Sequence, residues 1–295
     1  MSTSEIIRTK ISKSYELLDK LSSYYKELNI KDIKTGFDNE TDKDKLDSIN
    51  HIMLHEGRAA DIYWKNMAKI FNALAPEFNF KQRKNKSYSH DMNAADEINA
   101  MLNYGYAILE TLVRKYINTV GLDQDIGFLH EINKSKTPLV YDLQELYRWV
   151  IDLSVIQVLE EKRLKKSDFI VTENYNIRLR ESAAKQLINK IRINFNSVSK
   201  YKGKNRALEL TLLDNMRKLS DYVLGKSNIL NFYVPEVNID RNDDIEVRDR
   251  ILSITPAERK RFGINKSTLW YQQKAIKEGR KIKLYGNPRS NRKSC

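Results

Sequence analysis

The sequence predicts an all-α protein in which a multi-helix domain is followed by a C-terminal helix-turn-helix module. Helix breakers are scarce, with 10 glycines and 5 prolines among 295 residues. No proline lies between Pro138 and Pro235. Apolar residues recur at the 3.6-residue spacing of an amphipathic helix, and lysine, glutamate, leucine and isoleucine are abundant. Few breakers together with this spacing indicate helices rather than strands.

In the N-terminal part of the chain, the apolar spacing predicts three helices, over residues 5–28, 48–75 and 93–120. Pro76 ends the second of them, because proline cannot continue a helix. Gly121 follows the third, where a glycine is typical of a helix stop.

Two polar segments connect these helices. Residues 31–45 are expected to form a loop or a second short helix. Residues 77–92 carry several lysines and one arginine around Phe80 and Tyr88, and we expect them to form an exposed basic loop.

The second half of the domain continues the helical pattern. Residues 126–130 are a short apolar segment that ends at His130, and residues 133–138 are expected to form a loop. Three further helices are predicted, over residues 139–161, 177–198 and 204–224.

Composition along the chain predicts four parts. Residues 1–50 form an N-terminal helical segment, and residues 51–231 form the helical domain. Residues 232–250 contain Pro235 and an acidic run, which is typical of a linker. Residues 251–295 form the helix-turn-helix module with its basic tail.

The helix-turn-helix prediction depends on local start and stop signals. Thr255 is a helix N-cap, Pro256 suits the first helical position, and Glu258 completes a capping box. That helix ends near Phe262-Gly263, and a second helix runs from Ile264 to Gly279. Two helices joined by a tight glycine-containing turn are typical of DNA-binding modules.

The charge of the chain is concentrated at its C-terminal end. The whole sequence has a formal net charge of +13, and residues 251–295 hold 12 Lys and Arg against 2 Asp and Glu, a net of +10. A polyanion is the expected partner. A membrane surface is disfavoured, because no strongly apolar helix face accompanies the charge.

Cysteine usage and the polar start of the chain predict a cytoplasmic protein. Cys295 is the only cysteine, so an intramolecular disulfide and a cysteine-based zinc finger are excluded. The start Met1-Ser2-Thr3-Ser4-Glu5 lacks the apolar core of a signal peptide. No apolar run approaches the length of a membrane span.

Four residues are candidate catalytic groups: Glu56, His130, Asp142 and Glu145. Carboxylates and imidazole are ligands of hard divalent ions such as Mg²⁺ and Mn²⁺. Asp142 and Glu145 are three residues apart and would share a helix face. Each residue also has an ordinary structural explanation: a solvated face for Glu56, a buried satisfied histidine for His130, and surface ion pairing with Arg148 for the two acids.

The order of these residues and the strings around them resemble one protein family. The strings are Glu56-Gly57-Arg58-Ala59-Ala60, Asn103-Tyr104-Gly105-Tyr106-Ala107-Ile108-Leu109-Glu110, Gly121-Leu122-Asp123, Ile126-Gly127-Phe128-Leu129-His130-Glu131 and Asp142-Leu143-Gln144-Glu145. Together they are similar to the CRISPR-associated integrase family, over residues 50 to about 220.

The resemblance implies a metal-dependent DNA integrase and endonuclease. The positions that match the family's metal ligands are Glu56, His130 and Glu145, and Asp142 matches an acid that supports the site. The implied cofactor is Mg²⁺ or Mn²⁺. The implied reaction is transesterification, in which a DNA 3′-hydroxyl attacks a phosphodiester of a second duplex; water in its place gives nuclease activity.

Two departures from the family pattern point to a casposase, the integrase of casposon transposons. Family members usually carry an N-terminal β-rich domain that helps them dimerise, whereas the residues ahead of His51 read as helical. The basic C-terminal helix-turn-helix, which many CRISPR members lack, is the second departure. The resemblance then implies double-stranded DNA as partner, as donor ends and target site, and a homo-oligomer, a dimer or tetramer.

DNA contacts are predicted from basic and polar residues. Trp270 and Tyr271 are expected to pack within the module rather than stack on bases. The predicted DNA-binding residues are Arg58, Lys81, Arg83, Lys84, Arg259, Arg261, Lys266, Ser267, Thr268, Gln272, Gln273, Lys274, Arg280 and Lys281.

Three alternatives remain open from the sequence. A CRISPR spacer integrase would use the same site and work with a small partner subunit. A non-catalytic helix-turn-helix regulator predicts that Glu56, His130 and Glu145 do not converge. A helical di-iron protein needs Glu-x-x-His pairs, and the sequence contains none.

Overall fold

The computed structural model of the chain divides into two compact units, Met1–Ile239 and Asp240–Cys295, which are described separately. The described residues are 3–28, 30, 49–83, 94–127, 137–173, 176–201, 203–239, 251–261 and 263–277. Within them, no helix is long and apolar enough to cross a membrane.

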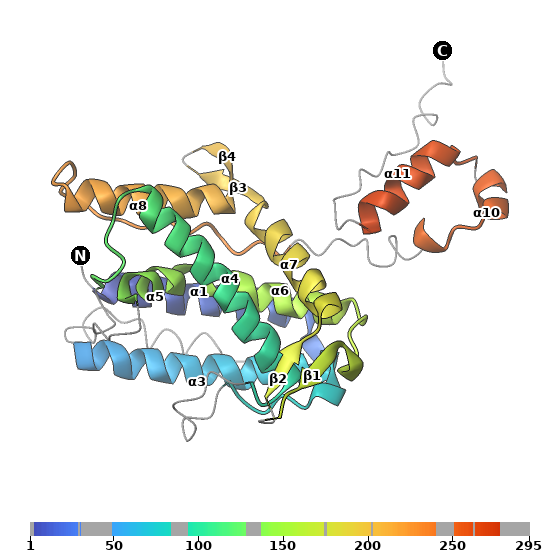
Figure 1. The fold of residues 1–295 in the computed structure, drawn as a ribbon, viewed down its shortest axis with the longest axis horizontal. Coiled ribbons are helices and arrows are strands. Elements are labelled where there is room, and N and C mark those ends of the chain that lie inside the picture. Colours follow the sequence, from blue (N-terminus) through green and yellow to red (C-terminus); the bar gives the residue numbers. More distant parts are fainter. Residues whose placement is uncertain are drawn as a thin grey trace, which may run out of the picture. The chain divides into compact units, whose positions relative to one another are not determined.

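The first unit is built from long helices packed around one core (Figure 1). Helix α1 lies alongside α3, and α6 contacts both of them as well as α4 and α7. The α-helices of this unit are α1 (Thr3–Tyr24), α3 (Ile49–Leu74), α4 (Glu97–Thr119), α5 (Pro138–Gln144), α6 (Arg148–Glu160), α7 (Glu181–Phe195) and α8 (Leu208–Val223).

Short elements connect these helices. The 3-10 turns are η1 (Lys26–Leu28), η3 (Pro76–Phe78), η5 (Glu145–Tyr147) and η6 (Lys166–Asp168). The strands are β1 (Phe169–Val171), β2 (Ile177–Leu179), β3 (Val198–Tyr201) and β4 (Lys204–Ala207). They pair as two antiparallel hairpins, with Ile170 opposite Arg178 and Ser199 opposite Arg206.

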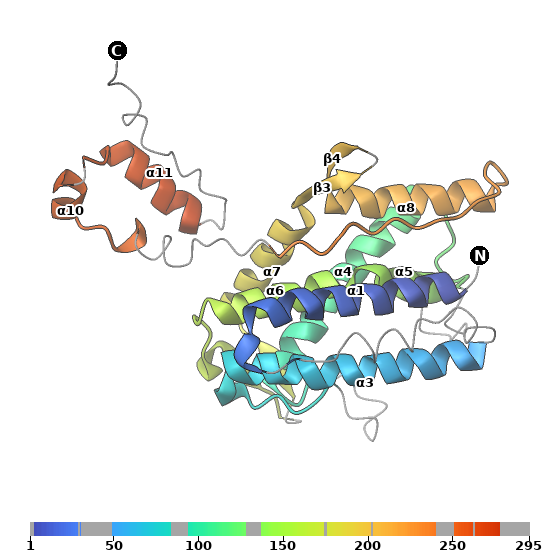
Figure 2. The same cartoon turned by 180° about the vertical axis from the view of Figure 1, so that it is seen from behind.

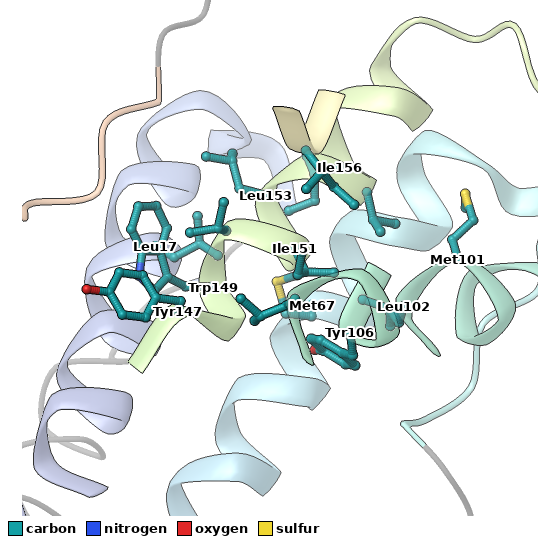
Figure 3. Packing of buried hydrophobic residues seen from close by; sticks show 14 of the residues in the cluster. Leu17, Met67, Met101, Leu102, Tyr106, Tyr147, Trp149, Ile151, Leu153 and Ile156 are labelled. Atoms are coloured by element: carbon teal, nitrogen blue, oxygen red, sulfur yellow. The ribbon is translucent and has the colours of Figure 1, made fainter. Parts of the chain in front are cut away.

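Helix α6 is the centre of the core. Every residue from Trp149 to Ile156 is buried, so this helix has no solvated face. Figure 3 shows Ile151 in the middle of the packing, with Trp149 and Leu17 of α1 on one side and Leu102 of α4 on the other. Because all faces of α6 are covered, the helix fixes the relative positions of α1, α3 and α4.

Most of the predicted helices are present, but three boundaries differ. The single helix expected over residues 139–161 is interrupted at η5, so α5 and α6 are separate helices. The helices expected from residues 177 and 204 begin instead with strands β2 and β4. Isolated hairpins of three or four residues are too short for periodicity to reveal them.

The expected stop at Gly121 is confirmed. Gly121 has a φ of +72°, the left-handed conformation that glycine adopts without steric cost. The amide of Leu122 donates to the carbonyl of Ile117 at 3.2 Å, as in a Schellman cap. At the other end of α4, the Asp96 side chain accepts from the amide of Asn99 at 2.7 Å.

The expectation of an exposed basic loop over residues 77–92 holds only in part within the described residues, where Lys81 and Gln82 are exposed but two aromatic side chains are not. Phe78 and Phe80 are buried in the core, Phe80 with its ring 5.1 Å from that of Phe71. The guanidinium of Arg83 donates to Asn99 and Asn103, both at 2.7 Å. Two aromatic side chains draw this segment inward. Residues 31–45 and 84–92 lie outside the described residues.

Residues 230–239, which we call the strap, run extended between α1 and α8 (Figure 2). Glu5 and Glu16 of α1 accept from the strap amides of Phe232 and Val237, at 3.0 and 2.6 Å. Asn215 of α8 accepts from the amide of Tyr233 at 3.0 Å. The first unit therefore includes residues 232–239, which the sequence assigned to a linker, and it also includes the N-terminal helix.

The second unit contains α10 (Pro256–Arg261) and α11 (Lys266–Lys277). Thr255 and Glu258 form the predicted capping box, with the Thr255 amide donating to the Glu258 carboxylate at 2.9 Å. Gly263, with a φ of +64°, lies in the turn between the helices. The core of this unit is small, with Ile251 and Leu269 buried.

The close packing of α4 on α6 yields a stability prediction. A Cβ built on Gly105 would overlap Cγ2 of Ile151, whereas one on Gly57 of α3 meets nothing within 4 Å. We expect Gly105→Ala to lower the free energy of unfolding by about 1–2 kcal/mol through overpacking. Gly57→Ala should raise it by up to about 1 kcal/mol, because alanine favours the helix. Urea unfolding of both variants checks this; equal effects would contradict the close approach.

Candidate active site

A pocket with a volume of about 80 Å³ lies between α1, α3, α4 and α6. Its lining is rich in charged and aromatic side chains, which is unusual for a cavity that borders a hydrophobic core. The lining residues are Lys10, Ile11, Lys13, Ser14, Glu56, Ala59, Ala60, Tyr63, Trp64, Tyr106, Glu145, Arg148, Trp149 and Asp152.

Glu56 and Glu145, two of the four predicted catalytic residues, meet in this pocket. Glu56 comes from α3, whose small residues Ala59 and Ala60 also border the cavity. Glu145 comes from η5, at the break between α5 and α6. The Lys10 ammonium on α1 contacts both carboxylates, at 2.6 Å from Oε2 of Glu145. Three segments far apart in the sequence therefore place two acids around one cation.

Glu145 is ionised despite its burial. Its side chain is only 8% exposed, and burial by itself raises its pKa. Arg148, at 2.7 Å from Oε1, and Lys10 outweigh that effect and lower the pKa to about 2. The predicted pairing of Glu145 with Arg148 is therefore present, but inside the pocket rather than on the surface.

Two guanidinium groups face the ring of Tyr106. The Arg148 guanidinium carbon lies 4.2 Å from the ring centroid, and that of Arg83 lies 5.3 Å from it. Cation–π contacts of this kind stabilise a buried positive charge. The Arg83 carbon is also 6.0 Å from the ring centroid of Trp64. Arg83, expected to contact DNA, is in the structure a support for the pocket wall.

Asp152 lies at the base of the pocket and is held by two tyrosines. The hydroxyl of Tyr63 donates to Oδ2 at 2.7 Å, and the hydroxyl of Tyr106 donates to Oδ1. Burial raises the pKa of Asp152, while the tyrosine hydrogen bonds and Arg148 oppose that rise. Burial likewise raises the pKa of Tyr63 and of Tyr106, so both remain donors at neutral pH.

Asp142 is fully buried beside the loop that leads to His130. A Cβ on Gly127 would come within 2.5 Å of Cβ of Pro138 and 2.9 Å of Oδ2 of Asp142, so only glycine fits there. This packing places Asp142 against the backbone three residues before His130. His130 itself lies outside the described residues.

The donor set fits a hard divalent cation. Two carboxylates that converge on one positive group match the oxygen ligands that Mg²⁺ and Mn²⁺ prefer. Among the described residues, no group of three or more His, Cys, Asp or Glu side chains forms a complete ligand set. His130 is the predicted third ligand, so the set remains a prediction for that residue.

Some of the predicted DNA-binding residues are exposed, and others form hydrogen bonds within their own unit. Arg259 donates to the carbonyl of Ile264 at 3.1 Å, and Gln273 donates to that of Ile251 at 3.0 Å, so both stabilise their own unit. Gln272 is half-buried. Lys84, Arg280 and Lys281 lie outside the described residues. The exposed residues are Arg58, Lys81, Arg261, Lys266, Ser267, Thr268 and Lys274.

The expectation that Trp270 and Tyr271 pack within the C-terminal module is wrong for the described part of that unit. The two side chains are 53% and 65% exposed. Their rings form an edge-to-face pair at 5.0 Å, and the Lys274 ammonium lies 5.0 Å from the Trp270 ring. Leu269 takes the buried position on α11 instead, next to Ile251 in the small core of this unit.

Sequence reasoning missed Lys10, Tyr63, Tyr106 and Asp152 as residues of the site. The sequence could have indicated that Asp152 is buried, because it is an acid within the apolar run from Trp149 to Ile156. Lys10 had a weaker signal, because it directly precedes Ile11 on the apolar face of α1. The tyrosines carried none, since aromatic residues at helical spacing are usual in a core.

Comparison with known proteins identifies the family. The family model described as "CRISPR associated protein Cas1" matches residues 2–192. The chain belongs to the Cas1 family. It is 27% identical to a CRISPR-associated endonuclease Cas1 of Archaeoglobus fulgidus over 242 residues, 77% of this chain and 69% of the relative. It is 32% identical to one of Francisella tularensis subsp. novicida over 182 residues, 61% of this chain and 51% of the relative.

A solved structure described as "Casposase bound to integration product" is also similar. It superposes with a TM-score of 0.72 and 37% sequence identity, over 85% of this chain and 68% of that one. The Cas1-family membership and this similarity support a role as a DNA integrase or nuclease.

The charge arrangement at Glu145 yields a prediction for the metal-free protein in EDTA. With a pKa lowered from 4.5 to about 2, Glu145 contributes about 3 kcal/mol to stability. This contribution is fully present above pH 4.5 and is lost as the pH falls from 4.5 to about 2. Glu145→Gln should therefore lower stability at pH 7 and flatten its pH dependence in that window.

Thermal unfolding across pH 2–7 measures both effects. Glu181→Gln is the matched control, because Glu181 forms an exposed ion pair with Lys185 on α7 and should give no measurable change. If Glu145→Gln matches the wild-type curve between pH 2 and 4.5, the carboxylate is not the buried anion described above.

Proposed function

We propose that the protein is a divalent-metal-dependent DNA integrase and endonuclease that joins a DNA 3′-hydroxyl end to a target duplex, and that it acts in casposon transposition. The observation that carries the proposal is the meeting of Glu56 and Glu145 in one charged pocket of a Cas1-family chain. The likeness to a casposase bound to its integration product supports the choice of transposition.

Glu56, His130 and Glu145 would hold Mg²⁺ or Mn²⁺, with Asp142 as a supporting acid. When bound, such an ion polarises a phosphoryl oxygen and lowers the pKa of the attacking hydroxyl. Other residues of the chain hold these ligands in the correct charge state and orientation. The Arg148 guanidinium keeps Glu145 ionised and oriented. Lys10, the other cation in contact with Glu145, also contacts Glu56.

The pocket suits phosphate chemistry electrostatically. Lys10 and Arg148 in the lining and Arg83 beside Tyr106 bring three positive charges to a region that holds three carboxylates, Glu56, Glu145 and Asp152. Lys13, also in the lining, is matched by Glu16. A metal ion added to this balance gives a net positive site. Positive charge fixed in place stabilises the extra negative charge of a pentavalent phosphorus transition state.

The second unit would bind double-stranded DNA, as donor end or target. Lys266, Ser267, Trp270, Tyr271 and Lys274 are spaced so that they share the exposed side of α11. Lysines interact with the phosphates, and the aromatic pair would contact the bases. The protein would act in the cytoplasm as a homo-oligomer, a dimer or tetramer on DNA.

A CRISPR spacer integrase is the second candidate, favoured by the CRISPR-associated endonucleases among the relatives. It would use the same residues with the same metal. Genomic neighbourhood separates the two: terminal inverted repeats and a family B polymerase indicate a casposon, and a repeat–spacer array indicates CRISPR adaptation. A non-catalytic regulator gives no reason for Glu56 and Glu145 to meet.

Strand transfer tests the catalytic proposal. Glu56→Gln and His130→Ala should each lower the rate of Mn²⁺-dependent joining of a labelled 3′-hydroxyl oligonucleotide to a plasmid by a factor of about 10³ or more. Each variant removes a proposed metal ligand. Binding of linear DNA should persist in both variants. Glu77→Gln, an exposed acid after α3, is the control and should join DNA normally. Undiminished joining by the two ligand variants would refute the metal site.

Removal of the second unit tests its role in DNA binding. A chain that ends at Ile239 keeps the strap and therefore the whole first unit. We expect weaker DNA binding and a smaller slope of log affinity against log salt, because fewer phosphates are neutralised. Fluorescence anisotropy between 50 and 200 mM salt measures the slope, on the order of one unit less for each lost lysine or arginine contact. An unchanged slope would show that the first unit makes the main contacts.

A further inference from the structure

The Lys10 ammonium occupies the position between the two carboxylates proposed as metal ligands. It contacts Glu56 directly and lies 2.6 Å from Oε2 of Glu145. Glu145 has a second cation, Arg148, on its other oxygen at 2.7 Å. Oε1 of Glu145 is thus paired with Arg148, and Oε2 of Glu145 shares the Lys10 ammonium with Glu56.

Helix α1 delivers Lys10 to this position with little freedom. Ile6, Ile7 and Ile11, on the same helix, are buried to 2% exposure or less. The helix contacts both α3, which carries Glu56, and η5, which carries Glu145. Moving the Lys10 backbone would therefore expose the core, so the residue is a fixed part of the pocket.

The Lys10 side chain, in contrast to its backbone, has room to move. It is 20% exposed, and the cavity of about 80 Å³ lies against it. Ser14, one turn further along α1, also borders that cavity and offers a hydroxyl acceptor. Lysine has a flexible four-carbon stem with a compact charge at its end, which suits a group that changes partner.

We propose that Lys10 is a built-in counter-cation, a positioning residue that neutralises Glu56 and Glu145 while the site is metal-free and leaves them when a divalent ion binds. The inference rests on the proposed function, because it takes these two acids as metal ligands. Two like charges close enough to share one ammonium in a largely buried pocket repel each other, and the ammonium between them offsets that cost. A divalent ion carries twice the charge and displaces it, and the ammonium stays in the pocket.

Mn²⁺ titration of the full chain without DNA tests the inference, with the electron paramagnetic resonance signal of free Mn²⁺ as readout. Lys10→Met should bind Mn²⁺ about tenfold more tightly than the wild type, because a positive charge no longer opposes the ion. In EDTA the same variant should unfold at a lower temperature than the wild type, since its carboxylates repel each other. Saturating Mn²⁺ should raise its melting temperature by more than it raises that of the wild type.

Two further variants separate charge from shape. Lys190→Met on α7 removes a lysine of similar exposure, 15%, that pairs with Glu161 at 2.7 Å away from the pocket, and it should leave Mn²⁺ affinity unchanged. Lys10→Arg keeps the charge, and it should bind Mn²⁺ no more tightly than the wild type.

The outcomes are distinguishable. If Lys10→Met binds Mn²⁺ no more tightly than the wild type, or if Lys10→Arg binds as tightly as Lys10→Met, the inference is overturned. If the wild type and Glu56→Gln bind Mn²⁺ equally poorly, the proposed metal site fails instead. In that case the displacement of Lys10 by a metal ion falls with the metal site, and a lower melting temperature of Lys10→Met in EDTA would support only its neutralisation of the two acids; an unchanged one would overturn that as well.

Discussion

Two carboxylates confined to one pocket must be matched by positive charge, and the first unit is arranged to supply that charge from two helices and one connecting segment. Lys10 arrives on α1, Arg148 on the first turn of α6, and Arg83 from the segment that follows η3. Each of these cations is anchored by packing that serves the core as well. Site geometry and core stability are therefore coupled: a substitution in the core shifts the charged groups, and the loss of one of these charges lowers the stability of the fold.

The aromatic residues of the pocket link the charges to the core. Tyr106 faces two guanidinium groups and donates its hydroxyl to Asp152, so one side chain contacts both signs of charge. Tyr63 brings α3 into the same network through Asp152. Buried polar networks of this kind are stable only when every member has a partner, which makes them specific for one arrangement of helices. The break between α5 and α6 allows η5 and the first turn of α6 to present Glu145 and Arg148 together.

Much of the helical framework was predictable from the sequence, because long amphipathic helices with clear stops are signalled locally. Gly121 and the Thr255–Glu258 capping box are examples. The pairing of Glu56 with Glu145 could be predicted only by family resemblance, since no local pattern joins α3 to η5. Lys10 was missed because a lysine beside an apolar stripe usually extends to water. Residues 77–92 were predicted to be an exposed loop because their basic composition gave no sign that Phe78 and Phe80 would be buried and Arg83 engaged. The hairpins were missed because strands of three or four residues are too short for apolar periodicity to detect.

The strap has a consequence for the order of events during synthesis. Its hydrogen bonds to Glu5 and Glu16 join residues 227 and 221 positions apart in the sequence. The helix that carries Lys10 is synthesised before the strap, yet some of its contacts come from the last residues of the first unit. Pairing over such separations is slow, because most of the chain must be ordered before the contact forms. Until the strap has been made, α1, which carries Lys10, lacks the hydrogen bonds by which the strap connects it to α8.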